Sequence, residues 1–181
     1  MKKFTKRAII GKYRAKTQRY KRRMCVGQEI ERKFLVREGL WHPKGQGLRV
    51  RQGYLPQKGE LLVRIRTQDD RAFLTLKGRT ISITRAEFEY EIPAADADAL
   101  LPFCQAPLIE KVRYLEPAGA HRFEIDCFFG ENEGLIVAEI ELSHEDEAFI
   151  RPDWLGAEVS GDSRYYNANL VAHPYRAWGK G

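Results

Sequence analysis

Three charged residues share one face of a short stretch near the start of the chain. In "EIERKFLV", Glu29, Glu31 and Lys33 alternate with other residues, so on a β-strand their side chains point to the same side. Carboxylates suit hard divalent cations such as Mg²⁺, whereas the ammonium group of a lysine binds phosphate oxygens. A strand that presents both predicts a site for a complex of a metal ion with a phosphate compound.

Charged and apolar residues alternate in the same way along much of the remaining chain. The charged faces carry Arg64 and Arg66, Thr75 and Lys77, Arg85 with Glu87, Glu89 and Glu91, Lys111 and Arg113, Arg122 with Glu124 and Asp126, and Glu139 and Glu141. A single antiparallel strand with one solvated face alternates too, and for one strand this is the default interpretation. Across the set, nearly every polar position is charged, and like-signed pairs recur two residues apart, about 6.5–7 Å along a strand.

Like-signed neighbours repel along a strand unless opposite charge lies between them. We therefore expect the sheet to close with its charged face inward, around a wet tunnel that binds compensating ligands, because isolated buried charges are costly. Bases suit a polyphosphate anion, and carboxylates suit a divalent metal ion. The apolar face would then pack outward against covering helices.

A hydrophobic period of two residues dominates from Gln28 onward and predicts β-strands. The expected strands span 28–36, 46–55, 60–67, 71–78, 82–92, 107–116, 120–129 and 133–143. Helices are expected at 93–104, at 143–150, and from Asp162 to just before Pro174. The fold class is thus mainly β with α (α+β): a closed eight-stranded antiparallel barrel with a charged interior and a few helices outside or across one end.

The length of 181 residues and the hydrophobic content of 43% are enough for one domain with a core of ordinary size. No apolar run approaches the roughly 20 residues that a membrane-spanning helix needs, so we expect no membrane partner. Cys25, Cys104 and Cys127 are odd in number and lack metal-ligand spacing, which is typical of reduced thiols in a cytoplasmic protein.

The net charge of +6 comes from residues 1–23, which hold eleven Lys and Arg and no acid, and the rest of the chain has 20 bases and 25 acids. We interpret residues 1–23 as a basic, disordered extension. It could be a polyanion-binding arm, a targeting segment with a poor apolar face, or sequence upstream of a true start at Met24. The domain is expected at 24–173 and a C-terminal tail at 174–181, with no function resting on the extension.

The stretch "EIERK" resembles the ExExK signature of the CYTH-type triphosphate tunnel metalloenzymes, a family named for its adenylyl cyclase and thiamine triphosphatase members. The resemblance continues in order through "RQGYL", "VRIR", "LTLKG", "RAEFEYEI", "EKVRY", "FEID", "AEIE" and "GAEVSGDSRYYN", and covers about residues 28–172. It implies a closed eight-stranded barrel whose tunnel binds triphosphate substrates and divalent metal. The chain looks like a short, single-domain bacterial-type form without the appended helical domain of longer members.

The resemblance also implies roles for individual residues. The implied metal ligands, for two Mg²⁺ or Mn²⁺ ions, are Glu29, Glu31, Asp126, Glu139 and Glu141. The implied phosphate contacts are Lys33, Arg64, Arg66, Lys77, Arg85, Lys111, Arg113 and Arg164. The implied catalytic set is Lys33, Tyr54, Glu87 and Glu89, with the last two positioning the attacking water. Related sequences often carry lysines at the positions of Ser163, Tyr166 and Ala168, so a basic contact from the last helix rests on Arg164 alone.

The function that the resemblance implies is metal-dependent hydrolysis of a triphosphate, with inorganic tripolyphosphate as the favoured substrate. An adenylyl cyclase or a thiamine triphosphatase would use the same tunnel. The latter needs an aromatic surface at the tunnel mouth, which Trp41 and Trp154 would supply unless they pack in the core, the more common role.

A sensor that binds polyphosphate or nucleotide without turnover is the alternative of another class, although so many carboxylates favour an enzyme. The expected partner is a small-molecule triphosphate substrate. We expect nucleic-acid binding only through residues 1–23, and the sequence leaves open whether the protein forms a homodimer.

Overall fold

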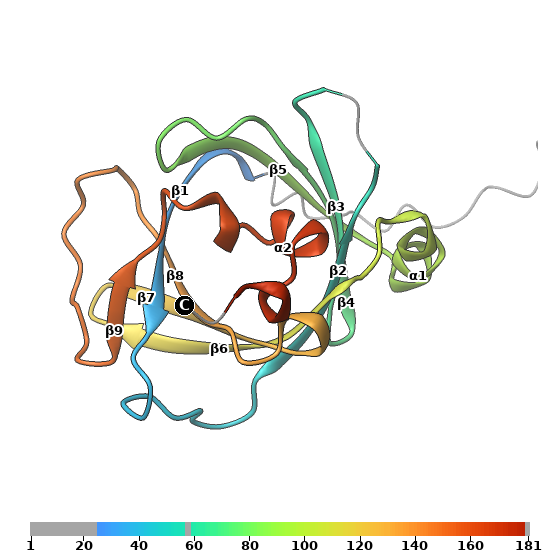
Figure 1. The fold of residues 1–181 in the computed structure, drawn as a ribbon. Coiled ribbons are helices and arrows are strands. Elements are labelled where there is room, and N and C mark those ends of the chain that lie inside the picture. Colours follow the sequence, from blue (N-terminus) through green and yellow to red (C-terminus); the bar gives the residue numbers. More distant parts are fainter. Residues whose placement is uncertain (1–24, 57–58, 180–181) are drawn as a thin grey trace, which may run out of the picture.

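Eight antiparallel strands form a closed ring in the computed structural model, which describes residues 25–56 and 59–179 (Figure 1). The basic extension at 1–23 and Met24 lie outside the described residues. The strands are β1 (Cys25–Val36), β2 (Leu48–Tyr54), β3 (Leu62–Gln68), β4 (Arg71–Lys77), β5 (Thr84–Ile92), β6 (Ile109–Ala118), β7 (His121–Phe128) and β8 (Ile136–Glu141). All eight predicted strands are confirmed, with ends shifted by at most three residues.

Strand β1 closes the ring because it changes partner halfway along. Residues 25–30 pair with β5, whereas residues 31–35 pair with β8. A ninth strand, β9 (Leu155–Glu158), pairs with β1 at Phe34 and Val36, along the edge from which β5 has diverged. The sequence pattern did not predict β9, because its four residues show no alternation and its hydrogen bonds depend on this edge of β1.

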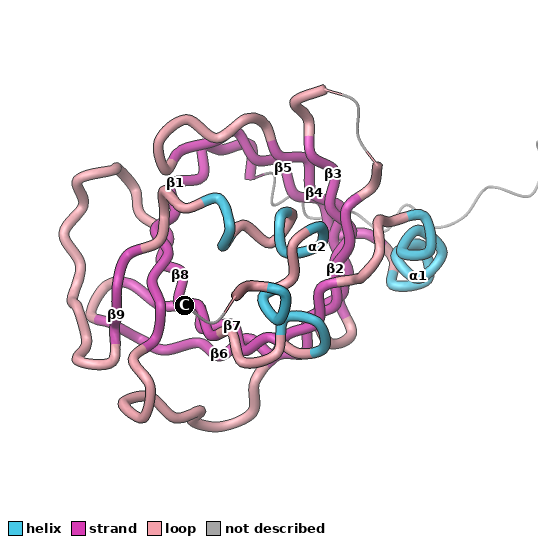
Figure 2. The backbone as a smooth tube through the Cα atoms, viewed as in Figure 1, coloured by secondary structure: helices cyan, strands magenta, loops and turns pink. Residues whose placement is uncertain are grey.

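The predicted helix at 93–104 is confirmed as α1 (Ala94–Leu100), which continues into the 3₁₀ turn η1 (Leu101–Phe103). Figure 2 shows α1 outside the ring of strands. Ala97 packs there with Ile65 and Ala72, from the outer faces of β3 and β4. This helix therefore covers part of the outward apolar face, as expected.

The predicted helix at 143–150 is wrong, since this segment is a loop with a single turn. The Glu147 carboxylate accepts hydrogen bonds from the backbone N–H and the hydroxyl of Ser143, which closes that turn. The chain then extends, so that the Phe149 ring meets the buried Phe34 ring edge-on at a centroid distance of 5.8 Å. Covering the apolar outer face of β1 thus outweighs the local helix signal.

The single helix predicted from Asp162 is also wrong. The chain instead forms the short turns η3 (Ser163–Tyr165), α2 (Asn169–Ala172) and η4 (Tyr175–Ala177), which follow η2 (Gly130–Asn132) earlier in the chain. Between η3 and α2, the Oδ1 of Asn167 accepts a hydrogen bond from Lys111 Nζ at 3.4 Å. Side-chain bonds of this kind compete with a continuous helix. No helix in the described part of the chain is long and apolar enough to span a membrane.

Helix α2 lies across one end of the barrel, within the ring of strands in Figure 1. Its Leu170 and Val171 pack on Ile109 of β6 and Val137 of β8. Each of these strand residues precedes a charged inward residue by two positions. The inward face is therefore apolar at the end covered by α2 and charged further along. Trp178, from the segment expected to be a tail, packs on the same cluster.

The two tryptophans proposed for a tunnel mouth pack on the outer face of the barrel. Trp41 meets the Tyr114 ring edge-on at 5.5 Å, and Trp154 meets the Phe123 ring edge-on at 5.1 Å. Both belong to the apolar cluster outside the ring. Their role is therefore packing.

Candidate active site

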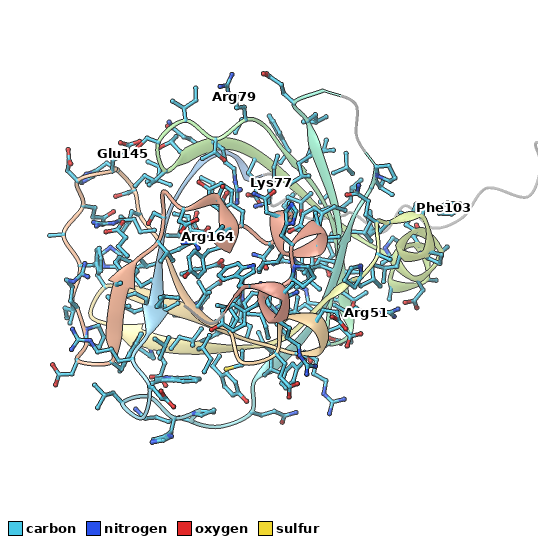
Figure 3. The ribbon with its side chains drawn as sticks, viewed as in Figure 1. Arg51, Lys77, Arg79, Phe103, Glu145 and Arg164 are labelled. Carbon is cyan, nitrogen blue, oxygen red and sulfur yellow. The ribbon has the colours of Figure 1, made fainter. Side chains whose placement is uncertain are left out.

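The charged faces of the strands point into the barrel, as predicted. The strand register sets bases beside acids, in the pairs Lys33–Glu139, Lys77–Glu87 and Arg113–Asp126. The lumen holds a cavity of about 560 Å³, a size typical of small-molecule sites. Its charged lining consists of Glu29, Glu31, Lys33, Arg64, Arg66, Lys77, Arg85, Glu87, Glu89, Arg113, Arg122, Glu124, Glu139 and Glu141. Figure 3 shows Lys77 inside the ring, whereas Arg51 and Arg79 lie outside it.

Acidic and basic side chains are concentrated on opposite walls of this cavity. Around the ring, strands β7, β8 and β1 lie across from β4, β3 and β2. The acidic wall carries Glu29, Glu31, Glu124, Glu139 and Glu141 together with the bases Lys33 and Arg122, and the basic wall carries Arg64, Arg66 and Lys77. Acids and bases line the cavity in equal numbers among the described residues. A bare anion or a bare metal ion would upset this balance, whereas a complex of the two supplies charge to both walls.

On the basic wall, Arg64 and Arg66 project side by side from β3 and share the carboxylate of Glu89. The Nη2 atoms of both arginines donate to Glu89 at 2.9–3.0 Å, and Arg64 Nη2 also donates to Thr75 Oγ1 at 3.1 Å. Burial and the neighbouring Arg64 lower the pKa of Arg66 to about 10. Within the described residues, the buried Nε atoms of both arginines have no hydrogen-bond partner. These unpaired donors suit an anion.

Lys33 of β1 is a base within the acidic wall, facing Glu139 of β8. Its Nζ lies between the carboxylates of Glu31 and Glu139 and donates to both. Burial acts to lower the pKa of Lys33, but these two carboxylates outweigh it and raise the pKa. Burial and the nearby Glu139 raise the pKa of Glu31. Lys33 is thus a fixed cation, and Glu31 is an acid whose charge is incompletely balanced.

Glu29 and Glu87 share the ammonium group of Lys77 where β1 meets β5. Lys77 Nζ donates to Glu87 and lies 3.4 Å from Glu29 Oε1, and Arg85 Nε donates to the other oxygen of Glu29, Oε2. Burial and the hydrogen bond to Glu29 raise the pKa of Glu87 to about 7. Burial would also raise the pKa of Glu29, but Lys77 and Arg85 lower it. Glu87 is therefore the carboxylate of this cluster whose pKa lies nearest neutral pH, while burial and the nearby Arg64 lower the pKa of Lys77 to about 8.

A third network extends from Arg113 and Glu139 at the cavity wall to the buried Asp126 and Lys111 behind it. Arg113 donates to Asp126 Oδ1 at 2.7 Å, to Asp126 Oδ2 at 2.6 Å and to Glu139 Oε2 at 2.9 Å. Lys111 Nζ donates to the same Asp126 carboxylate. Asp126 has no exposed surface, and neither it nor Lys111 lines the cavity. These two predicted site residues therefore support the wall instead of facing the open lumen.

A second, smaller cavity opens at the end covered by α2, between the segments 78–83 and 160–169. It shares Lys33, Arg64 and several other charged residues with the larger cavity, and it adds Tyr54. The charged lumen therefore continues to this end of the barrel.

Residues 27–175 match the CYTH domain. The chain belongs to the CYTH family.

Among the relatives of this CYTH protein is the inorganic triphosphatase of Acetivibrio thermocellus, which is 45% identical over 152 residues, or 83% of this chain and 97% of the relative. The inorganic triphosphatase of Nitrosomonas europaea is 38% identical over 150 residues, or 79% of this chain and 96% of the relative. The crystal structure of the inorganic triphosphatase NE1496 matches with a TM-score of 0.57 and 36% identity, over 79% of this chain and 93% of that chain. These similarities span nearly the whole length of each relative.

The donor set of the acidic wall fits a divalent cation of the kind that the CYTH family implies. Glu31 and Glu141 are directly opposed on β1 and β8. Burial and neighbouring carboxylates raise the pKa of both residues, so negative charge is in excess here. Hard oxygen donors suit Mg²⁺ or Mn²⁺. Within residues 25–56 and 59–179, no three such side chains already converge in an arrangement that could hold a metal, and bases contact several of the carboxylates.

Arg164, predicted to contact phosphate from the last helix, is not brought to the lumen of the CYTH barrel. Its side chain is exposed, donates to Asp162 at 2.6 Å and lies over the Trp178 ring. It lines neither cavity. Arg164 stays at the surface because the C-terminal helix is broken: η3 ends at Tyr165, and the chain then turns Asn167, instead of Arg164, inward.

Several polar residues inside this CYTH domain had no role predicted from the sequence. They include Gln52, Thr75, Glu124 and Asn167. Thr75 and Glu124 lie on charged faces that the alternation had identified, so their inward placement was predicted and only their roles were not. Gln52 precedes Tyr54 by two residues and shares its face. Asn167 had no local signal, because it lies in the irregular turn before α2.

Proposed function

We propose that this protein is a divalent-metal-dependent hydrolase of inorganic tripolyphosphate, which releases phosphate and pyrophosphate. The observation that carries the proposal is the placement of a basic wall and an acidic wall on opposite sides of one cavity. A triphosphate would bind the bases, and a divalent cation bound to it would meet the acids. The two relatives that are named inorganic triphosphatase support this substrate.

The bases of the lumen would bind and orient the phosphate groups. Arg64 and Arg66 offer forked donors, whereas Lys33 and Lys77 act as point charges. In phosphoryl transfer the charge is spread over the equatorial oxygens, so cations fixed beside them lower the barrier. Ion pairs with the surrounding carboxylates hold these cations in place before the substrate binds. Arg85 and Arg113 would extend this set along the lumen.

Glu29, Glu31, Glu139 and Glu141 would hold Mg²⁺ or Mn²⁺, and we propose two ions. Such an ion would supply positive charge at the phosphate oxygens and so favour departure of pyrophosphate. Lys33 contributes by fixing two of these carboxylates, Glu31 and Glu139. Asp126 would join the ligands only if it released Lys111 and Arg113.

Glu87 is the better candidate to accept the proton of the attacking water. Its pKa of about 7 suits proton transfer near neutral pH. The pKa of Glu89 is lowered by Arg66 and Arg64 despite the opposing effect of burial, so Glu89 is the weaker base. Water oxygen would then attack the terminal phosphorus as the bond to the pyrophosphate oxygen breaks. Lys33 and Tyr54 would contact the phosphates at the end covered by α2.

The deciding experiment measures phosphate release from tripolyphosphate, ATP and thiamine triphosphate, with Mg²⁺, with Mn²⁺ and with a chelator. We expect tripolyphosphate to give the highest kcat/KM and the chelator to abolish release. Glu31→Gln should lose activity, and Glu131→Gln, at an exposed position in η2, is the matched control. Full activity in Glu31→Gln would refute the metal assignment.

The same panel separates the alternatives. Cyclic AMP formation from ATP would identify an adenylyl cyclase, and preference for thiamine triphosphate would identify a thiamine triphosphatase. Tight metal-linked binding without turnover would identify a polyphosphate or nucleotide sensor. We place the protein in the cytoplasm, in keeping with the free thiols of Cys104 and Cys127. We also propose that its partner is the small triphosphate itself, with dimerisation left to a sizing experiment.

A further inference from the structure

Gln52 is buried inside the barrel and makes a hydrogen bond that a residue needed only to fill space would not make. It lies on the inward face of β2, directly opposite Arg66 of β3, and is 1% exposed. Its Nε2 donates to Tyr54 Oη at 2.9 Å. Its Oε1 has no hydrogen-bond partner within the described residues. A methionine would fill the same volume without burying an unpaired amide oxygen, which is costly. The amide is therefore accounted for by its bond to Tyr54.

Tyr54 stands at the boundary between the apolar and the charged part of the lumen. Its ring packs in the cluster that contains Leu170 of α2, and it lines the smaller cavity together with Lys33 and Arg64. Burial raises the pKa of Tyr54, so the hydroxyl keeps its proton. A phenol has a single hydrogen to donate. Because Oη already accepts the N–H of Gln52, that hydrogen points elsewhere.

The charged groups that bear most on the Tyr54 hydroxyl are largely cations. Arg64, Arg85 and Lys33 all act on it, with Glu139 as the opposing acid. Ammonium and guanidinium groups cannot accept a hydrogen bond, whereas the oxygen of an anion bound among them can. We propose that Gln52 is a positioning residue, which turns the hydroxyl hydrogen of Tyr54 to a phosphate oxygen bound between Lys33 and Arg64. This inference deepens the proposed function and rests on it.

A double-mutant cycle tests the proposal. The proteins are the full chain and its variants Gln52→Met, Tyr54→Phe and the combination, with Gln28→Met on the outer face of β1 as the matched control. Two quantities are measured for each: kcat and KM with tripolyphosphate and Mg²⁺, and the rise in melting temperature that tripolyphosphate causes without metal. Melting temperatures without ligand show that each variant is folded, and Gln52→Leu replaces any Gln52→Met protein that is not.

We expect Gln52→Met to lower kcat on the order of tenfold, as is typical when a group that orients a reacting residue is removed. Tyr54→Phe should lower kcat at least as much. The combined variant should match Tyr54→Phe, because Gln52 acts only through the hydroxyl. If Gln52→Met lowers kcat by the same factor in the wild type and in Tyr54→Phe, the proposal is overturned and the role of Gln52 is packing. An unchanged kcat in Gln52→Met would overturn it as well.

Gln52→Glu tests the direction of the hydrogen bond, because a carboxylate accepts but does not donate. Wild-type kcat in Gln52→Glu would mean that Tyr54 donates to residue 52, against the proposal. If the wild type releases no phosphate, the proposed function fails, and the cycle is read from the tripolyphosphate-dependent melting temperatures. Non-additive shifts then support the role of Gln52, and additive shifts refute it. If tripolyphosphate neither stabilises the wild type nor is hydrolysed by it, both the proposed function and the role of Gln52 are refuted.

Discussion

Glu31 of β1 and Glu141 of β8 stand directly opposite each other inside the barrel. Like charges at facing positions of two strands destabilise a sheet. Burial and nearby carboxylates raise the pKa of both residues, which reflects the same excess of negative charge. The surrounding bases reduce this repulsion without removing it, so a cation bound at the acidic wall would relieve it.

Glu141→Gln should therefore separate stability from metal response. The change removes the repulsion with Glu31 without breaking any ion pair formed within the described residues, so the metal-free protein should melt at a slightly higher temperature. The further rise caused by Mg²⁺ should fall by at least half, because one oxygen ligand has lost its charge. Differential scanning calorimetry with and without Mg²⁺ measures both effects, and Glu131→Gln is the control. A destabilised variant with an undiminished Mg²⁺ response would contradict the assignment.

Arg66→Lys should weaken substrate binding more than it slows the chemical step. Lysine keeps the charge but loses the forked donors, including the buried Nε that has no partner among the described residues. We expect KM for tripolyphosphate to rise about tenfold, in line with the loss of a charge-assisted hydrogen bond. Steady-state kinetics measure the change, and Arg51→Lys outside the barrel should leave KM unaltered (Figure 3). Equal KM values for the two variants would argue against a basic phosphate wall.

Arg113→Met should be the most destabilising single change in the lumen. It leaves the fully buried Asp126 with Lys111 as its remaining partner and removes a bond to Glu139. Breaking a buried ion pair from one side typically costs about 3–5 kcal/mol of unfolding free energy. Urea denaturation measures the loss. Adding Asp126→Asn should not restore it, because the buried Lys111 ammonium then loses its carboxylate partner among the described residues, and a double variant more stable than Arg113→Met would oppose this account.

The loop at 143–150 should weaken in acid because of Glu147. Hydrogen bonds from Ser143, and then from His121, lower the pKa of Glu147 from 4.5 to about 2. The Glu147 carboxylate thus holds its proton more weakly in the folded than in the unfolded protein. Its contribution to the free energy of unfolding is therefore complete above pH 4.5 and is lost as the pH falls towards 2. Glu147→Gln should be less stable than the wild type at pH 6, and the difference should vanish near pH 2. Urea titrations across this range test it, with Glu131→Gln as the control, and a pH-independent difference would exclude Glu147 as the source.

The alternation of charged and apolar residues determined the main features of the barrel from the sequence. It identified the eight strands, the charged inward faces of seven of them and the mixed acidic and basic nature of the lumen, because side chains on a strand alternate strictly between two faces. The ExExK stretch and the segments that follow it indicated the family. The chemistry of the site could thus be predicted from local patterns.

Only the tertiary structure decided where those charges meet. The separation into two walls depends on ring closure through the partner change of β1, and no single strand encodes it. Long-range packing also replaced the predicted helix at 143–150 by a loop and left Arg164 at the surface. The contact of Gln52 with Tyr54 is local in sequence, yet the role that we propose for it depends on cations from β1, β3 and β5. A sequence pattern specifies which face a side chain takes, whereas register and closure specify its neighbours across the lumen.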